Sequence, residues 1–258
     1  MIPNSIATLL KTTRQYFWNL GFDEVEVPYL NSALPLEPNL YSFSTIWSHS
    51  QEKYYLPTSP EFALKNHLAS TKKNCFAIAH CFRDLETEGP HHTKEFLMLE
   101  WYEIGKTYLE LMKSVKNYVS KFLNLKFLNY SLPSNLPANE PDFNQFFLNE
   151  VQPKLPSDGV FVTGYPAFLS PLSKVSESNV FSARSDRFEL YINGIEIANG
   201  CTENRDPNSI LQSFKKEQTY RLKNHLPTHP YSEKFISDCS KIPPCAGVGL
   251  GLNRLLLI

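Results

Sequence analysis

The stretch CFRDLETEGPHHTKEFLMLEWYEI, residues 81–104, predicts two β-strands joined by a polar, charged hairpin loop. Side chains alternate between the two faces of a strand, so residues counted back from Arg83 in steps of two share one face. All of them are small: Cys81, Ala79, Ala77 and Cys75. On the returning strand, the residues that share one face are Phe96, Met98, Glu100 and Tyr102. The face with small residues therefore has room for a small anionic ligand that carries a flat base.

The composition is that of one large domain. The chain has 258 residues, of which 42% are hydrophobic, and this is enough to bury a substantial core. With 25 Lys and Arg against 26 Asp and Glu, no basic excess indicates bulk nucleic-acid binding. We find no long apolar run and no secretion signal, and expect a cytoplasmic protein without membrane association. The five cysteines contain no CxxC pair and predict neither a disulfide framework nor a zinc site.

The remaining elements predict an α+β fold in which helices surround a largely antiparallel sheet. We expect a single domain over 1–258, with a surface insertion at 124–160 that contains a short helix at 143–150. Ser59 is expected to cap a helix that has Pro60 at its first position. The other expected helices are 4–20, 107–123 and 207–225. The other expected strands are 22–27, 163–173 and 186–199. Residues 248–258 are expected to return to the core, whereas 31–53 reads as irregular.

A second hairpin, RFELYINGIEIANG at 187–200, turns at the strongly predictive pair Asn193-Gly194. A two-residue turn pairs Tyr191 with Glu196 and Glu189 with Ala198, which places both carboxylates on one face. Carboxylates on neighbouring strands repel unless a cation lies between them, and a hydrated magnesium ion on nucleotide phosphates would serve. The alternative is the solvent-facing side of an edge hairpin.

The C-terminal stretch AGVGLGLNRLLLI, residues 246–258, has three alternating glycines followed by an expected apolar helix that carries Arg254. Glycines at this spacing let a ligand or another backbone approach closely, although the pattern is neither a dinucleotide fingerprint nor a P-loop. A guanidinium in an apolar segment needs a partner, and a polyphosphate fits its planar fork. An arginine on the surface of a helix is the other reading.

Four motifs follow one another along the chain: TSPEFALK (58–65), FRDLE with HHTKEFLMLEWY (82–102), RFELYINGIEIANGCTE (187–203) and GVGLGLNR (247–254). Together they resemble class II aminoacyl-tRNA synthetases of the lysine subgroup, and within it the free-standing ligases that attach β-lysine to elongation factor P. A fifth segment, GFDEVEVPYL at 21–30, is similar to the first class II motif, whose proline (Pro28 here) lies at a dimer interface and implies a homodimer.

The resemblance implies ATP and Mg²⁺ as cofactors. By it, Arg83 would hold the α-phosphate, Glu86 would contact the adenine edge, and Phe96 would stack on the base. Arg254 would lie against the other face of the adenine and reach the γ-phosphate, so Arg83 and Arg254 are the expected catalytic residues. The residues implied around ATP are Arg83, Asp84, Glu86, Thr93, Phe96, Glu196, Ile197, Gly251 and Arg254, and the metal ligands are Glu189 and Glu196.

The same resemblance implies a lysine-type amino acid as substrate, with Tyr102 and Glu203 at its distal ammonium group. The expected chemistry is in-line attack of the substrate carboxylate on the α-phosphorus, followed by transfer to a lysine of elongation factor P. Charging of tRNA is disfavoured, because we expect no anticodon-binding domain. The implied substrate-binding residues are Ser59, Pro60, Glu61, Glu100, Tyr102, Asn199 and Glu203.

Some positions depart from the family pattern and keep alternatives open. Thr93 and Lys94 replace an asparagine and a proline, and Asn253 replaces an aspartate. Gly249 stands where the β-lysine ligases tend to have alanine, which leaves α-lysine and β-lysine both possible. The alternative functions are a catalytically silent synthetase-like binding protein, a lysyl-tRNA synthetase catalytic domain and an ammonia-using asparagine synthetase.

Overall fold

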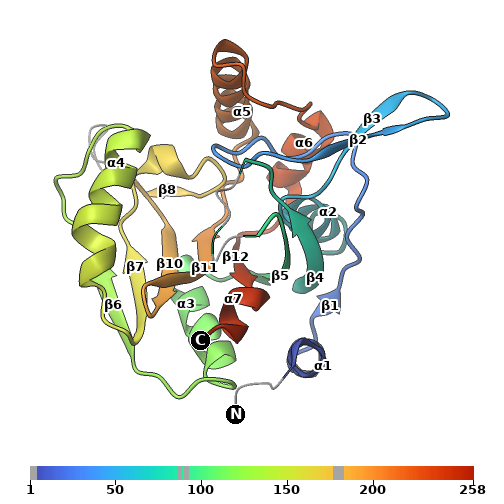
Figure 1. Ribbon diagram of the computed structural model, residues 1–258. Helices are drawn as coiled ribbons and strands as arrows, with labels where there is room; N and C mark the ends of the chain where they lie inside the picture. Colours follow the sequence, from blue (N-terminus) through green and yellow to red (C-terminus); the bar gives the residue numbers. More distant parts are fainter. Residues whose placement is uncertain (1–4, 86–88, 90–92, 177–182) are drawn as a thin grey trace.

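An eight-stranded sheet forms the centre of the computed structural model, which describes residues 5–85, 89, 93–176 and 183–258 (Figure 1). Its strand order is β1-β4-β5-β12-β11-β10-β7-β6. The six central strands pair antiparallel, and the two edge strands, β1 and β6, pair parallel with their neighbours. The α+β prediction with a largely antiparallel sheet is confirmed. The strands are β1 (Asp23–Glu24), β4 (Cys75–Phe82), β5 (Glu95–Ile104), β6 (Phe127–Ser131), β7 (Gly159–Thr163), β10 (Arg187–Ile192), β11 (Ile195–Thr202) and β12 (Cys245–Gly251).

Helices cover both faces of the sheet (Figure 1). One face packs on α1 (Ile6–Asn19), α3 (Tyr108–Val119) and the short α7 (Leu252–Leu256), and the other lies towards α2 (Glu61–Thr71), α5 (Pro207–Lys223) and α6 (Glu233–Lys241). Sequence analysis found all of these helical regions except α6. Among the described residues, no helix combines the length and the apolar character needed to cross a membrane.

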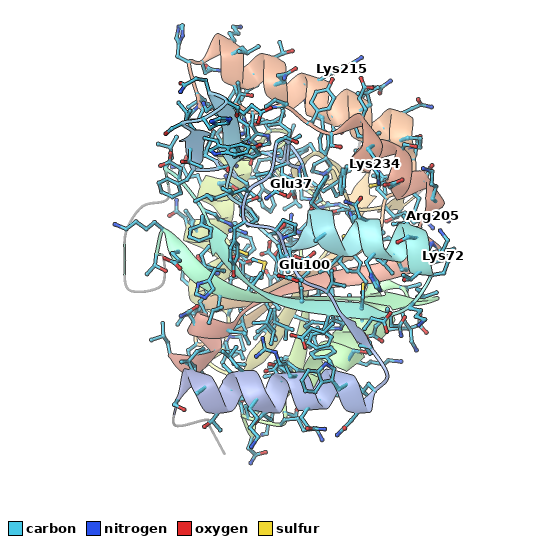
Figure 2. The ribbon with its side chains drawn as sticks, turned by 90° about the vertical axis from the view of Figure 1, so that its right-hand side faces the viewer. Glu37, Lys72, Glu100, Arg205, Lys215 and Lys234 are labelled. Carbon is cyan, nitrogen blue, oxygen red and sulfur yellow. The ribbon has the colours of Figure 1, made fainter. Side chains whose placement is uncertain are left out.

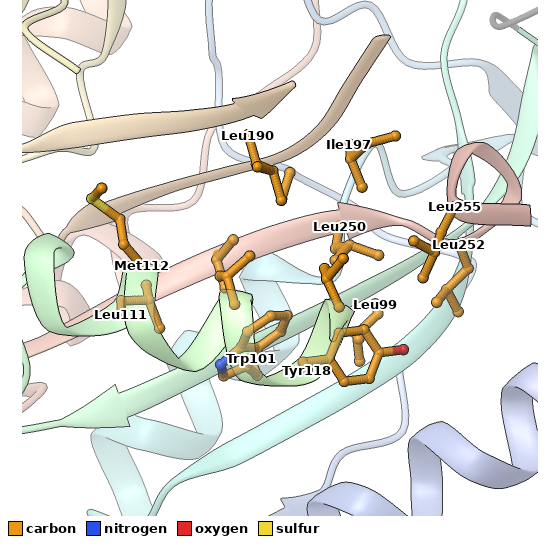
Figure 3. Close-up of a cluster of buried hydrophobic side chains, with 14 of the residues drawn as sticks. Leu99, Trp101, Leu111, Met112, Tyr118, Leu190, Ile197, Leu250, Leu252 and Leu255 are labelled. Carbon is orange, nitrogen blue, oxygen red and sulfur yellow. The ribbon is translucent and has the colours of Figure 1, made fainter. Parts of the chain in front are cut away.

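The main hydrophobic core lies between the sheet and the α1–α3 side (Figure 3). Trp101 on β5, Leu250 on β12 and Leu190 on β10 meet Leu111 and other side chains of α3 there. The capping box of α3, in which Thr107 and Glu110 bond each other's backbone N–H groups, fixes where this helix begins. The bulky face of the first hairpin is therefore the core face, and its small face is left for α2 and a cavity.

The predicted faces of the first hairpin are confirmed by its register. Cys75 lies opposite Tyr102, Ala77 opposite Glu100, and Cys81 opposite Phe96. Small residues on β4 thus face large polar or aromatic residues on β5. Large side chains can lean over their small neighbours here without forming a closed hydrophobic layer.

Three local expectations were wrong. The segment 31–53 contains a hairpin of β2 (Ser44–Trp47) and β3 (Glu52–Tyr55), and only two residues of 22–27 form a strand. The strand expected at 163–173 ends at Thr163, because Pro166 and Pro171 lack the N–H groups that a ladder needs. Residues 167–169 form a 3₁₀ turn instead, and the short pair β8 (Val175–Ser176) and β9 (Arg184–Ser185) follows.

The segment 124–160 does more than form a surface insertion. Its start supplies the edge strand β6, and its helical part extends over α4 (Glu140–Phe146), a π-helical turn (Phe147–Val151) and a 3₁₀ turn (Gln152–Lys154). The expected helix at 143–150 lies within this part. Phe143 and Phe147 pack against Tyr165 and Tyr191, so the segment covers one end of the sheet beside the cavity described next.

Candidate active site

A cavity of about 400 Å³ lies on the sheet face that α2 and α6 partly cover. Both predicted arginines, Arg83 and Arg254, line this one cavity. Of the other predicted residues, Pro60 and Asp84 do not line it, and Glu86 lies outside the described residues. The predicted residues that do line it are Ser59, Glu61, Arg83, Thr93, Phe96, Glu100, Tyr102, Glu189, Glu196, Ile197, Asn199, Glu203, Gly251 and Arg254.

The alternating glycines of β12 keep the floor of the cavity open. Gly247 lies opposite Tyr102 and Gly249 opposite Glu100 in the pairing of β12 with β5. A methyl group on Gly247 would lie 2.6 Å from Cδ1 of Tyr102, which shows that the ring occupies the space above the glycine. The larger side chains of β5 can therefore lie flat across β12, and their polar ends reach the cavity.

Each arginine is held from a different part of the chain. The Arg83 Nε donates to the Thr58 carbonyl at 3.3 Å, and its guanidinium carbon lies 5.2 Å from the centre of the Phe96 ring. The Arg254 Nη1 donates to the Glu196 carbonyl at 2.9 Å and lies 3.6 Å from the Glu196 carboxylate. Two cationic side chains thus lie at fixed positions on the wall of the cavity, as the binding of a polyanionic ligand requires.

Three buried carboxylates, Glu61, Glu100 and Glu203, line the opposite part of the cavity. The Tyr102 hydroxyl donates to Glu100 at 2.7 Å. Burial raises the pKa of Glu100 well above its ordinary value, and burial also raises the pKa of Glu203 although the Lys65 ammonium opposes it. A group of buried carboxylates of this kind favours the binding of a cationic ligand.

Sequence analysis missed Lys65, which lies within one of the motifs that it quoted. The Lys65 Nζ lies 2.6 Å from the Glu61 carboxylate and 2.6 Å from the Glu203 carboxylate. The spacing of Glu61 and Lys65, four residues apart on α2, is the usual spacing of a helical ion pair and could have indicated the first contact. The second contact depends on tertiary structure and had no signal in the sequence.

The second hairpin has the predicted turn but not the full predicted register. Asn193 and Gly194 both have positive φ, 52° and 73°, as a type I′ turn requires. Tyr191 faces Glu196 as expected, but a β-bulge follows, so that Glu189 pairs with Asn199 rather than with Ala198. The extra residue, Ile197, reverses the alternation. Because of it, Asn199 and Glu203 reach the cavity together with Glu196.

The Glu189 carboxylate has an extensive set of partners that the sequence did not reveal. It accepts hydrogen bonds from the Tyr165 hydroxyl at 2.6 Å and the Tyr191 hydroxyl at 2.7 Å, and it forms an ion pair with Arg187. The Arg187 guanidinium also lies over the Tyr165 ring and donates to Asn199. Arg187 thus supplies part of the positive charge that sequence analysis assigned to magnesium alone.

Two of the departures from the family pattern have clear local roles. The Asn253 side-chain oxygen accepts a hydrogen bond from the Leu97 backbone N–H at 2.6 Å, which ties the start of α7 to β5. The Thr93 hydroxyl donates to the Glu95 carbonyl at 2.7 Å. An asparagine oxygen can accept this N–H as an aspartate oxygen would, so the substitution at Asn253 leaves the position of Arg254 supported.

A loop closes one side of the cavity, and Glu37 faces the cavity from this loop (Figure 2). The buried Arg221 of α5 holds the loop, because it donates to the carbonyls of Glu37 and Leu40 and stacks 4.6 Å from the Tyr41 ring centre. Burial, together with the nearby Glu61 carboxylate, raises the pKa of Glu37 to about 8. Sequence analysis assigned no role to this loop.

We expect Glu37→Gln to flatten the pH dependence of the free energy of unfolding between pH 6.5 and 8. The unfolded chain ionises Glu37 near pH 4.3, whereas the folded protein keeps its proton until about pH 8. The folded state therefore binds more protons in this range, and its stability falls as the pH rises. Urea unfolding at three pH values measures the slope. The exposed Glu26→Gln is the control, and equal slopes for the wild type and Glu37→Gln would contradict the assignment.

The antiparallel sheet, with its glycine floor and two arginines in one cavity, is that of a class II synthetase catalytic domain. The chain belongs to this family: the family described as tRNA synthetases class II (D, K and N) matches residues 5–258. Its sequence is 27% identical to an elongation factor P–(R)-β-lysine ligase of Buchnera aphidicola, over 98% of this chain and 88% of that protein. A protein of the same name from Vibrio cholerae is 31% identical over 98% of this chain and 89% of its own length. Another from Salmonella dublin is 29% identical over 100% of this chain and 91% of its own length. The chain is thus an enzyme of the ligase class.

Proposed function

We propose that this protein activates a lysine-type amino acid with ATP and transfers it to a lysine side chain of elongation factor P. The observation that carries the proposal is the placement of Glu61, Glu100 and Glu203 in the same cavity as Arg83 and Arg254. The carboxylates suit the ammonium groups of the amino acid, and the arginines suit the phosphates of ATP. The names of the relatives supply the acceptor protein.

The chemistry requires positioning and charge neutralisation rather than an enzyme nucleophile. The carboxylate of the amino acid attacks the α-phosphorus of ATP, an acyl–phosphate bond forms, and pyrophosphate leaves with the electron pair of the broken P–O bond. Arg83 would neutralise the charge on the α-phosphate, and Arg254 the charge on the leaving pyrophosphate. The amine of the acceptor lysine then attacks the acyl carbon and releases AMP.

The hairpin carboxylates fit a magnesium ion that arrives with the nucleotide. Burial raises the pKa of Glu196 and the nearby Glu189 carboxylate raises it further, although Arg254 and Arg187 oppose this effect. A cation beside Glu196 would reduce the repulsion between the two carboxylates. Among the described residues, no group of three or more acidic, histidine or cysteine side chains could hold a metal alone. Glu196 and Glu189 would hold the ion together with phosphate oxygens, and the ion would neutralise phosphate charge.

Exchange of labelled pyrophosphate into ATP tests the activation step directly. We expect exchange with α-lysine or (R)-β-lysine, and none with aspartate or without amino acid. The transfer step is tested by the mass of elongation factor P, which should increase by one lysyl group. Exchange that depends on aspartate would instead support an amide synthetase. Binding of ATP without exchange for any amino acid would support the silent binding protein, against which the intact Asn253 and Thr93 contacts argue.

We expect Gly249→Ala to shift the substrate preference towards β-lysine. A methyl group on Gly249 would lie 3.3 Å from the Met98 Sδ and 3.8 Å from the Glu100 carboxylate, so the flexible Met98 can yield while the space beside Glu100 narrows. One methyl group in a substrate pocket changes discrimination by roughly tenfold or more. The ratio of kcat/KM for the two lysine isomers measures the shift, and an unchanged ratio would show that Gly249 does not contact the substrate.

We also propose that the protein is a homodimer, with Pro28 near the interface. Several large apolar side chains close to this proline in sequence are at least half exposed: Trp18, Leu20, Tyr29 and Leu30. Apolar surface of this kind is typical of subunit interfaces. We expect sedimentation equilibrium to give the mass of a dimer and the Leu30→Lys variant to shift towards the monomer. A wild-type monomer at micromolar concentration would contradict this proposal.

A further inference from the structure

Lys65 is a fully buried cation at the amino-acid end of the cavity. It projects from α2, one turn after Glu61, and its side chain has no exposed surface. Its Nζ is equally close, 2.6 Å, to the carboxylates of Glu61 and Glu203. Burial lowers the pKa of Lys65, but these two carboxylates outweigh burial and raise that pKa well above its ordinary value. Lys65 therefore keeps its charge.

The charges at this end of the cavity suggest why a cation is built into it. In the free site burial favours the protonated form of Glu100. With a lysine-type substrate bound, Glu61, Glu100 and Glu203 provide three negative charges, and Lys65 removes one. The two that remain equal the number of ammonium groups on a lysine-type substrate. Three buried carboxylates without Lys65 would repel one another, and one would take up a proton.

We propose that Lys65 is a positioning residue of the amino-acid site: its ammonium group bridges Glu61 and Glu203 and holds both carboxylates in place, so that they can receive the two ammonium groups of the substrate. This inference rests on the proposed function for the identity of the substrate. Lys65 acts through the two carboxylates and does not contact the reacting atoms. The substrate then meets two carboxylates that are already held in position.

The other groups around Lys65 do not supply the balancing charge. Burial raises the pKa of Cys201 well above its ordinary value and that of Cys239 to about 11, so both thiols remain neutral. The Phe235 ring lies 5.7 Å from the Nζ and is uncharged. The titratable groups that act on Lys65 from the surrounding elements are Glu37, Glu61, Glu100, Cys201, Glu203, Cys239 and Cys245.

Urea unfolding of the ligand-free protein from pH 6 to 8 tests the charge role. In Lys65→Met we expect one carboxyl group of the folded state to take up a proton that the unfolded chain does not hold. The difference in bound protons between the two states then grows by about one, and the free energy of unfolding falls more steeply with pH. Lys65→Met/Glu203→Gln restores the original net charge and should restore the wild-type slope, even if the single variant folds poorly. Lys73→Met, at a mostly exposed lysine just after α2, is the matched control. A wild-type slope in Lys65→Met, or a steeper slope in the double variant, would overturn the proposal.

Calorimetric titration of α-lysine and (R)-β-lysine in two buffers of different ionisation enthalpy tests the recognition role. We expect Lys65→Met to release about one more proton on binding than the wild type, with an affinity that improves by up to about tenfold per pH unit. The affinity for ATP should not change. Weaker binding with an unchanged proton count would indicate a merely structural role. If the wild type binds neither isomer, the proposed function and the recognition role both fail, whereas the unfolding curves still decide the charge role.

Discussion

Arg83→Ala is expected to reduce lysine-dependent ATP–pyrophosphate exchange by about 10²- to 10³-fold. This is the usual effect of removing one fixed group that stabilises charge in the transition state. Arg83 follows β4 directly and lines the cavity, where Thr58 and Phe96 hold its guanidinium. In the proposed reaction its charge faces the phosphorus at which the new bond forms. The loss should therefore appear mainly in kcat, with a smaller change in the KM for the amino acid.

Two further variants separate charge from geometry at this position. Arg83→Lys keeps the positive charge but loses the planar fork, and we expect it to recover only part of the activity. Arg14→Ala removes an arginine of similar exposure that pairs with Glu24 on the surface, and we expect wild-type exchange. Full activity of Arg83→Ala would show that the α-phosphate is held elsewhere and would remove the central support for an adenylate-forming site.

Strand periodicity explains why the position of Arg83 could be predicted from the sequence. Alternation along β4 and β5 needs only local backbone geometry, so the small face and the bulky face were both correct. The Asn193-Gly194 turn was predictable for the same reason, because few residue pairs accept positive φ at both positions. Signals of this kind are contained within a few consecutive residues.

The features that the sequence did not reveal depend on contacts between distant segments. No residue near Ile197 marks the bulge, which arises where β11 must pair with both β10 and β12, and it changes which residues reach the cavity. The ion pair of Lys65 with Glu203 joins residues far apart in the chain. The hydrogen bond from Arg221 to the Glu37 carbonyl does the same. Lys65 balances part of the negative charge of the site, and a local pattern predicts an acidic residue more readily than its distant partner.

Gly247→Ala is expected to abolish lysine-dependent exchange and to destabilise the fold by about 1–3 kcal/mol, the usual cost of adding a methyl group to a closely packed position. The new methyl would lie 2.6 Å from Cδ1 of Tyr102 and 2.9 Å from the Glu203 carboxylate. Tyr102 is almost completely buried and donates to Glu100, so its ring cannot move without disturbing the carboxylates of the amino-acid site. One methyl group thus displaces two of the groups proposed to recognise the distal ammonium.

Gly249→Ala is the matched control for this result, because it makes the same substitution two residues along β12. Its nearest neighbour is the flexible Met98 side chain at 3.3 Å, so we expect a stable protein that retains exchange with (R)-β-lysine, the isomer that this variant should prefer. Thermal unfolding with and without lysine distinguishes loss of the site from loss of the fold. For Gly247→Ala we expect a folded protein that lysine no longer stabilises while ATP still does, since the arginines lie at the other end of the cavity. Equal stabilisation of both variants by lysine would show that the amino acid does not occupy the space between Tyr102 and Glu203.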